Sequence, residues 1–244
     1  MCGRYASFRE AQDLADEFAL ASIADDVRLL PASWNVAPTD PIRIIVERPE
    51  RLADGSHGAI QRTLRAARWG LVPSWAKDRS IGAKMINARM ETVLTKPAFR
   101  RAAASRRALV PADGYYEWLP PEPGAGPRAR KQPIYLHPGD GGSLALAGLY
   151  EFWTDPAKAA DDPSRWLVTA TIITTTAVDE MGRVHDRQPV MLLPDRWDAW
   201  LDPAVGAEEA AAQLASNAPR LELTPVSTAV NTVGTNGPEL ILPL

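Results

Sequence analysis

Strand-like segments outnumber helical segments along this chain of 244 residues, and the two kinds do not alternate. Runs of β-branched, aromatic and other apolar residues predict strands over 42–46, 65–72, 108–111, 115–119, 133–136, 143–150, 166–174 and 221–226. Apolar residues at helical spacing predict helices only over 8–20, 96–104, 194–201 and 207–215. A doubly wound parallel fold would need a helix between successive strands. The pattern therefore favours an α+β protein with a mostly antiparallel, barrel-like β-sheet core and peripheral helices.

The segments between these elements include no linker long enough to divide the chain, and the sequence has no internal repeat. We therefore expect a single domain over residues 1–244. Ser7 is the expected N-cap of the first helix. Loops or turns are expected at 34–39, at 47–64 as a variable hairpin, at 112–114, and at 120–131 as a mobile segment rich in Pro, Gly and Arg.

Composition excludes several classes of protein. A single cysteine rules out an intramolecular disulfide and a cysteine-rich zinc cluster, and it suits a reducing cytoplasm. No apolar run reaches the length of a membrane span, and residues 1–20 lack a signal-peptide pattern. We therefore expect a cytoplasmic protein that does not bind a membrane and needs no metal or other cofactor.

Charge gives only a local indication of a partner. The net charge of −3 provides no general argument for binding nucleic acid. Four arginines bracket a short alanine run, at Arg100, Arg101, Arg106 and Arg107. A solvated helix face is the favoured explanation of this cluster, and a phosphate-binding patch is the alternative.

The only cysteine directly follows the first methionine, in Met1-Cys2-Gly3-Arg4-Tyr5. Removal of Met1 would leave Cys2 with a thiol and a free α-amine on adjacent carbons. An α-amine titrates at about pH 7.7–8.0 and a lysine at about 10.4, so far more of the α-amine is neutral at pH 7. Such an amine can attack an aldehyde to form an imine. The neighbouring thiol can then close a five-membered thiazolidine, favoured by its high effective concentration.

Three further segments place polar side chains among apolar ones. Asn87 follows Met85-Ile86, Glu117 lies between aromatic residues, and His185 follows the end of a threonine-rich strand. Burial would raise the pKa of Glu117 and suit it to proton transfer near neutrality. A lone strand glutamate is, however, more often half of an ion pair with arginine. A structural histidine and a turn-forming asparagine are the corresponding alternatives for His185 and Asn87.

Long motifs occur in a fixed order from residue 1 to residue 241 and resemble one family. They are MCGRY at 1–5, WNVAPT at 34–39, RWGLVPSWA at 68–76, INARMET at 86–92, RALVPADGYYEW at 107–118, LAGLYE at 146–151, IITT at 172–175, HDRQPV at 185–190 and NGPELI at 236–241. On these motifs the chain resembles the SOS-response-associated peptidase (SRAP) family, the abasic-site processing proteins. The resemblance extends over nearly the whole chain.

The resemblance implies a covalent crosslink to an abasic site in single-stranded DNA. By the family's pattern, the Cys2 amine forms an imine with the sugar aldehyde, and the Cys2 thiol closes the thiazolidine. Glu117 would move protons and serve the self-removal of Met1. His185 would assist ring opening or reversal, and Asn87 would hold the amine and the ring oxygen. The expected protein is a monomer that acts on DNA at the nucleoid or replication fork.

The same resemblance suggests residues that contact DNA. Arg4, Arg89 and Arg187 would bind phosphates beside the lesion. Trp69 and Trp118 are candidates for stacking on bases, which contributes about 1–3 kcal/mol per base. Thr174 would orient His185 within the DNA site. Core packing is the alternative for every tryptophan, and it is the expectation for Trp34, Trp197 and Trp200.

Two departures and three alternatives remain open at this point. Ala108 stands where many relatives have a second cysteine, and Gln188 stands where methionine is expected. Glutamine amidotransferases also begin Met-Cys-Gly, so an N-terminal-nucleophile amidohydrolase is one alternative. A cysteine peptidase that uses Cys2 and His185 is another. A non-covalent single-strand DNA-binding module built from the same Trp and Arg residues is the third.

Overall fold

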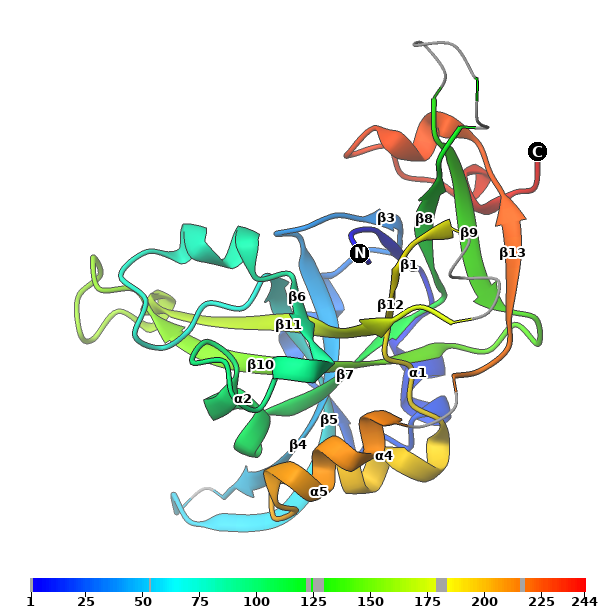
Figure 1. The fold of residues 1–244 in the computed structure, drawn as a ribbon. Coiled ribbons are helices and arrows are strands. Elements are labelled where there is room, and N and C mark those ends of the chain that lie inside the picture. Colours follow the sequence, from blue (N-terminus) through cyan, green and yellow to red (C-terminus); the bar gives the residue numbers. More distant parts are fainter. Residues whose placement is uncertain (1, 53, 122–123, 125–129, 179–183, 216–217) are drawn as a thin grey trace.

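A computed structural model of the protein describes residues 2–52, 54–121, 124, 130–178, 184–215 and 218–244 (Figure 1). The strands form two sheets. The first has the order β13-β9-β8-β1-β3, and the second has the order β12-β11-β10-β7-β4-β5-β2, with β6 paired to β11. Most pairings are antiparallel, and the few helices lie outside the strands. The predicted α+β class is confirmed.

The five-stranded sheet contains β1 (Tyr5–Ser7), β3 (Ser33–Val36), β8 (Gly114–Leu119), β9 (Gln132–Pro138) and β13 (Leu221–Pro225). The eight-stranded sheet contains β2 (Ser22–Ile23), β4 (Pro41–Arg51), β5 (His57–Trp69), β6 (Asn87–Arg89), β7 (Arg107–Ala112), β10 (Leu144–Thr154), β11 (Trp166–Thr176) and β12 (Arg187–Pro189). In the described part of the chain the α-helices are α1 (Ala11–Glu17), α2 (Arg100–Ser105), α4 (Pro194–Leu201) and α5 (Ala207–Ala212).

A short parallel contact closes the larger sheet into a barrel. Strands β11, β10, β7, β4 and β5 pair antiparallel in turn, and β5 then meets β11 again at Arg68–Thr169 and Trp69–Ala170. Alternate residues of a closed sheet face inward. Ile44, Val110 and Ile172 therefore share one buried cluster inside the ring. The predicted barrel-like core is confirmed.

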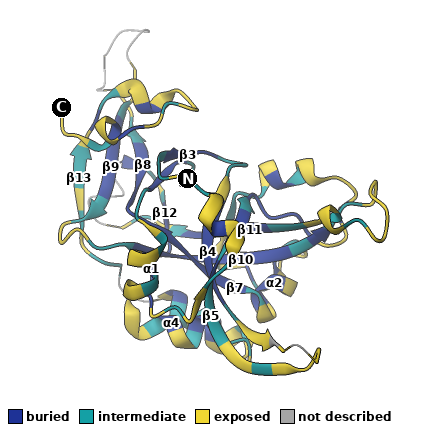
Figure 2. Cartoon of the chain, turned by 180° about the vertical axis from the view of Figure 1, so that it is seen from behind, coloured by how far each residue is buried: buried dark blue, intermediate teal, exposed yellow. Residues whose placement is uncertain are grey.

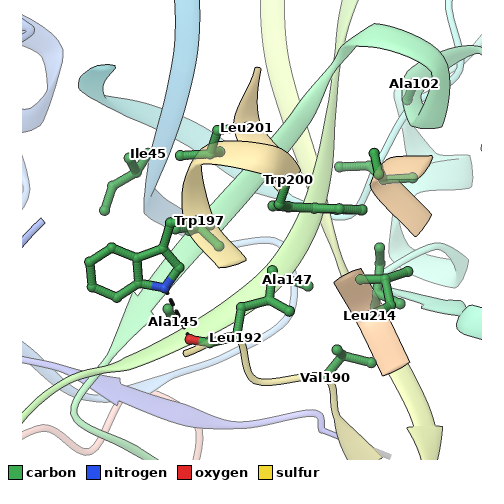
Figure 3. Packing of buried hydrophobic residues seen from close by; sticks show 14 of the residues in the cluster. Ile45, Ala102, Ala145, Ala147, Val190, Leu192, Trp197, Trp200, Leu201 and Leu214 are labelled. Atoms are coloured by element: carbon green, nitrogen blue, oxygen red, sulfur yellow. Dashed lines mark hydrogen bonds between the residues drawn. The ribbon is translucent and has the colours of Figure 1, made fainter. Parts of the chain in front are cut away.

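Helices cover the outer face of this barrel. Figure 2 shows that buried residues follow the central strands, whereas the helices expose one side. Phe18 stacks on Trp197 with ring centroids 4.5 Å apart. Figure 3 shows Trp197 and Trp200 of α4 packed over the barrel, with the Trp197 indole nitrogen donating to the carbonyl of Leu192 at 3.0 Å. The expectation that these two tryptophans belong to the core is confirmed.

Helix α4 has the predicted bounds, and the predicted 207–215 helix divides into α5 and a 3₁₀ turn, Gln213–Ala215. The first helix is shorter than predicted, and its N-cap is Glu10 rather than Ser7. Ser7 ends β1 instead, where it pairs with Ser33. The amphipathic spacing of 8–20 was therefore a correct signal for a helix but not for its start.

One predicted loop is partly regular structure, and the predicted hairpin at 47–64 is confirmed. Ser33–Val36 forms β3, so the loop prediction for 34–39 is wrong in its first half. The 47–64 region is a long hairpin, because β4 runs to Arg51 and β5 begins at His57. Most of the predicted mobile loop at 120–131 lies outside the described residues.

The turn at Asp113 connects the two sheets. Strand β7 pairs with β10 and β4, whereas β8 pairs with β1 and β9. The Asp113 carboxylate fixes this crossing, since Oδ2 accepts the backbone N–H of Phe8 at 2.7 Å and Oδ1 accepts from Arg9 Nε at 2.8 Å. Residue 113 therefore anchors the start of the chain to the point where the sheets meet.

No helix in the described part of the chain is long and apolar enough to cross a bilayer.

One arginine of the predicted solvated cluster is buried. Arg107 donates from Nε to the carbonyl of Trp200 at 2.6 Å and from Nη1 to those of Ala103 and Ala104 at 3.0 and 2.8 Å. Its Nη2 bonds the carbonyls of Asp202 and Val205. The solvated-face explanation is therefore wrong for Arg107, which caps the C-terminal ends of α2 and α4.

Arg107→Lys should destabilise the fold by roughly 2–4 kcal/mol, because a lysine cannot satisfy five carbonyls arranged around a planar fork. Urea unfolding followed by tryptophan fluorescence measures this difference. Arg100→Lys, at an exposed position of α2, is the matched control. Equal midpoints for the two variants would contradict the capping role.

Candidate active site at the N-terminus

Pairing on both edges of β1 carries the N-terminal residues into the protein interior. Tyr5 pairs with Val36 on one side and Tyr115 on the other. The N–H of Tyr116 donates to the carbonyl of Arg4 at 2.9 Å, so the residues before Tyr5 continue along β8. Cys2 is fully buried and shares a cluster with Tyr5 and Tyr115. Met1 lies outside the described residues.

Asn87 fixes the backbone of Cys2. It begins β6, which pairs parallel with β11 so that Asn87 stands beside Ile172. The side-chain Nδ2 of Asn87 donates to the carbonyl of Cys2 at 2.8 Å. Among the described residues, its buried Oδ1 has no hydrogen-bond partner. This acceptor belongs to the same amide group that holds Cys2 and remains available to an N–H or O–H donor.

Glu117 has the burial and the pKa expected of a side chain that transfers protons near neutral pH. It lies on β8 with 4% of its surface exposed. Burial raises the pKa of its carboxyl to about 7. Burial also raises the pKa of the Cys2 thiol, and the Glu117 carboxylate contributes in the same direction. The two groups therefore interact, and both favour their protonated forms.

His185 lies beside the same site on the segment that enters β12. The Arg187 N–H donates to His185 Nδ1 at 3.0 Å, and Asp186 Oδ1 lies 2.7 Å from that nitrogen. The Asp186 carboxylate favours the protonated ring, whereas burial opposes it. Burial is the larger effect, so the pKa of His185 is lowered. A neutral imidazole with its side chain 33% exposed can accept or relay a proton at neutral pH.

Three predicted DNA-contact residues meet at the end of β11. Thr174 lies in register between Arg89 of β6 and Pro189 of β12. Arg187 Nη2 donates to the Thr174 carbonyl at 2.6 Å, and the same guanidinium holds Glu91 through two bonds of 2.6 and 3.0 Å. The Thr174 side chain is buried against the carbonyl of Ala88 and against Arg187. Thr174 thus supports Arg187, while Arg89 is exposed.

Arg4 and Trp118 are tied to the C-terminal segment. Arg4 Nη1 donates to Asn35 Oδ1 and to the carbonyl of Val230, each at 2.8 Å, and the residue is only 9% exposed. The Trp118 indole N–H donates to Asn231 Oδ1 at 2.6 Å. The Arg4 guanidinium lies 5.9 Å from the centre of the Trp118 ring. These two predicted DNA contacts belong to one network.

The comparison with known families decides how this arrangement is classified. The profile of the SOS response associated peptidase (SRAP) family matches residues 1–233. The chain belongs to this family. YoqW of Bacillus subtilis is 37% identical over 243 residues, with 99% of each chain covered. YedK of Escherichia coli is 30% identical over 254 residues, with both chains covered completely.

A vertebrate protein and two solved structures extend the comparison. HMCES of Gallus gallus is 31% identical over 237 residues, which cover 87% of this SRAP chain and 66% of HMCES. YoqW, YedK and HMCES are each named abasic site processing proteins. A protein of Bacteroides thetaiotaomicron shares the fold over the full length of both chains, with a TM-score of 0.79 at 23% identity. A phage-related protein of Bordetella bronchiseptica matches with a TM-score of 0.62 at 29% identity, covering 92% of this chain and 94% of its own.

One predicted DNA contact of this SRAP protein is wrong. Trp69 has no exposed surface, packs edge-on against Tyr5 with centroids 5.3 Å apart, and donates its indole N–H to the carbonyl of Ile86 at 2.9 Å. A base cannot stack on a ring that is covered on all sides. Trp69 instead supports the walls of the site, through Tyr5 and the residue that precedes Asn87.

Sequence reasoning missed Asn35. Its Nδ2 lies within hydrogen-bond distance of the carbonyls of Val230, Thr232 and Thr235, at 3.3, 3.2 and 2.8 Å, while its Oδ1 accepts from Arg4. The only sequence signal was an amide between the apolar residues Trp34 and Val36.

No group of three or more His, Cys, Asp or Glu side chains able to hold a metal occurs in the part of the chain that is described.

A buried carboxyl with a raised pKa makes folding stability depend on pH. The folded protein keeps Glu117 protonated between its ordinary pKa and about pH 7, whereas the unfolded chain releases that proton. Stability therefore falls as pH rises through this window and levels off above it. Glu117→Gln should remove the loss and stabilise the protein at pH 8 by roughly 2–3 kcal/mol relative to wild type, but little at pH 4.

Urea unfolding of wild type and Glu117→Gln at pH 4, 6 and 8 measures this effect. Glu222→Gln, at an exposed position of β13, is the control and should show no such trend. A Glu117→Gln advantage that is constant over pH would show that the carboxyl is ionised throughout.

Proposed function

We propose that this SRAP protein recognises abasic sites in single-stranded DNA and becomes covalently crosslinked to them through Cys2 after removal of Met1. The observation that carries the proposal is the buried Cys2, whose carbonyl is held by Asn87 at 2.8 Å and whose thiol interacts with Glu117. The names of full-length relatives supply the DNA lesion. Formation of the crosslink would shield the lesion during the response to DNA damage.

The chemistry balances, with the methionine released from position 1 and one water from imine formation as its by-products. Hydrolysis of the Met1–Cys2 peptide bond consumes one water and frees the Cys2 α-amine. That amine adds to the aldehyde of the ring-opened abasic sugar, and loss of one water gives the imine. The thiol then adds across the C=N bond, with its proton passing to nitrogen, and the thiazolidine closes. No redox partner or metal takes part in these steps.

Each polar group has a proposed task in this sequence. Asn87 holds the Cys2 backbone and offers its Oδ1 as an acceptor to the amine. Glu117, with a pKa of about 7, donates the proton that removes water and accepts the thiol proton. It also serves the hydrolysis that removes Met1. His185, whose lowered pKa favours the neutral ring, assists opening of the sugar ring or reversal of the crosslink.

DNA binding is proposed to involve the arginines around this site. Arg89 is exposed and is available to a phosphate. Arg187 is held by Glu91 and Thr174, and Arg4 by Asn35, so both would present a guanidinium already fixed in position. Trp118 offers a partly exposed ring for base stacking. We propose that the protein acts as a monomer on nucleoid or replication-fork DNA in the cytoplasm.

Wild-type protein should form an adduct that survives denaturing gels with an oligonucleotide whose uracil has been removed by a glycosylase, and Cys2→Ala should form none. Cys2→Ser keeps the amine but lacks the sulfur that closes the ring. It should therefore give only an imine, trapped by borohydride and otherwise lost. Intact-mass spectrometry should find the mature wild-type chain starting at Cys2.

A durable Cys2→Ser adduct would contradict the thiazolidine step. Equal non-covalent binding of abasic and intact strands, with no adduct, would favour a simple binding module. Cys2-dependent release of ammonia from glutamine would favour an amidohydrolase, and Cys2-dependent cleavage of unrelated peptides would favour a peptidase.

The rate of crosslinking should rise with pH through about 7, because the Glu117 carboxylate accepts the thiol proton and its fraction grows about tenfold between pH 6 and 8. The Glu117→Gln variant should crosslink more slowly, and its rate should not show the rise with pH through about 7. A rise set by the α-amine, at about pH 7.7–8.0, should remain. To separate the step from Met1 removal, rates are measured on protein produced with Cys2 already exposed by a co-expressed aminopeptidase. Identical profiles for the two proteins would exclude Glu117 from the chemistry.

A further inference from the structure

A concave site lies where the barrel closes, away from the Cys2 thiol. Strands β5 and β11 pair only at Arg68–Thr169 and Trp69–Ala170, and the residues that precede these pairs diverge. A cavity of about 430 Å³ occupies the resulting seam. Its walls come from both strands and from the segment that leads into β4: Ala66 to Arg68, Trp166 to Val168, Thr39, Pro41 and Asp26.

The chemistry of this cavity is aromatic and cationic. Trp166 stands at its wall with 59% of its surface exposed, which is unusual for the largest apolar side chain. Arg68 also lines the cavity, and its Nη1 is buried with no hydrogen-bond partner among the described residues. A buried donor without an acceptor is costly, so this nitrogen favours an incoming acceptor or anion. Pro41, Ala66 and Ala67 supply the apolar remainder of the surface.

Two other residues limit which ligands fit the cavity. Asp26 Oδ1 accepts the N–H of Ala66 at 3.2 Å, so this carboxylate is engaged with the wall of the cavity. The Asp26 carboxylate disfavours an anionic group of a ligand beside it, but it can accept a hydrogen bond from an amino group. Thr39 holds a positive φ of 76°, a costly conformation for a β-branched residue, and its N–H donates to the carbonyl of Trp69 at 3.0 Å. The cavity thus suits a ligand with one planar ring and one negative charge.

The two strands that line the cavity also support the Cys2 site. Trp69 follows Arg68, packs on Tyr5, and bonds the carbonyl of Ile86, which precedes Asn87. Along β11, Ile172 is in register with Asn87, and Val168 lies four residues earlier. At the rise of a β-strand, this separation is about 13 Å. This separation is short enough for a strand bound at the Cys2 site to extend to the cavity.

We propose that this cavity is an accessory nucleotide subsite for the DNA strand that runs from the lesion. A base stacks on Trp166, and its phosphate pairs with Arg68. This inference rests on the proposed function, since it identifies the occupant by continuity with the DNA at Cys2. The subsite adds affinity for strands that continue beyond the abasic position on one side and makes binding depend on flank length.

The test is an affinity series. Oligonucleotides carry a tetrahydrofuran abasic analogue, which has no aldehyde and cannot crosslink, and are extended one nucleotide at a time on the 5′ or the 3′ side. Fluorescence anisotropy gives the dissociation constant of each. Wild type should gain affinity in a step once one flank reaches the cavity. Trp166→Ala should lose that step, roughly tenfold, and bind the short strands unchanged.

Two further variants separate stacking from charge. Trp166→Phe should keep most of the step. Arg68→Gln should reduce the slope of log affinity against log salt by about 0.7 for long strands only. Ile60→Ala, an exposed apolar position at the other end of β5, is the matched control and should behave as wild type.

Equal affinities of Trp166→Ala and wild type at every flank length would overturn the subsite. So would an equal loss on short and long strands. The proposed function is judged separately, by covalent capture of a true abasic site by wild type. If that capture fails, the same variants measured on undamaged oligothymidylates of increasing length still decide whether the cavity binds a nucleotide.

Discussion

Two-sided pairing of β1 is the constraint on which the site depends. A strand of three residues has little stability of its own, yet Tyr5 is held by Val36 and Tyr115 together. Chain termini are usually poorly ordered unless such pairing ties them down. Here the pairing carries Cys2 into a cluster with the buried face of the barrel, opposite Asn87. The geometry of the N-terminus is therefore a property of the whole fold rather than of the first residues.

The other end of the chain completes this support. Asn35 contacts the carbonyls of Val230, Thr232 and Thr235, and through Arg4 it connects them to β1. The same segment binds Trp118 through Asn231. Residues more than 190 positions apart thus hold one another, and the carbonyl of Val230 would otherwise be a buried polar group without a partner. A change near residue 230 would alter the site without touching Cys2.

The elements that local patterns predicted well are those with local causes. Helix α4 has its predicted bounds, since Pro194 starts it and its apolar face packs through Trp197 and Trp200. Strands β1, β6 and β12 have only three residues each, and their existence depends on partners far away in the sequence. No periodicity can be detected in so short a segment. Their absence from the predicted element set follows directly.

The candidate site shows the same division. Asn87 and Glu117 were detectable because polar residues interrupt apolar runs, and burial does raise the pKa of Glu117. Trp69 and Arg107 were misjudged, because composition indicates neither which tryptophan is covered nor which arginine meets a helix end. Asn35 needed the C-terminal segment to become visible. Side-chain chemistry was predictable from sequence, whereas exposure was a result of long-range pairing.

Burial and reactivity set opposing demands on the proposed chemistry. Burial holds the Cys2 thiol protonated, so a free thiolate is not the attacking species at neutral pH. The same burial brings Glu117 to a pKa of about 7, where it takes up and releases protons with equal ease. In the proposed reaction, attack by sulfur must then be coupled to proton transfer, and the pKa of Glu117 suits it to accept that proton. Because both side chains are buried together, the thiol does not persist as a thiolate that could react with other molecules. Glu117 nevertheless remains beside the Cys2 thiol as a proton acceptor.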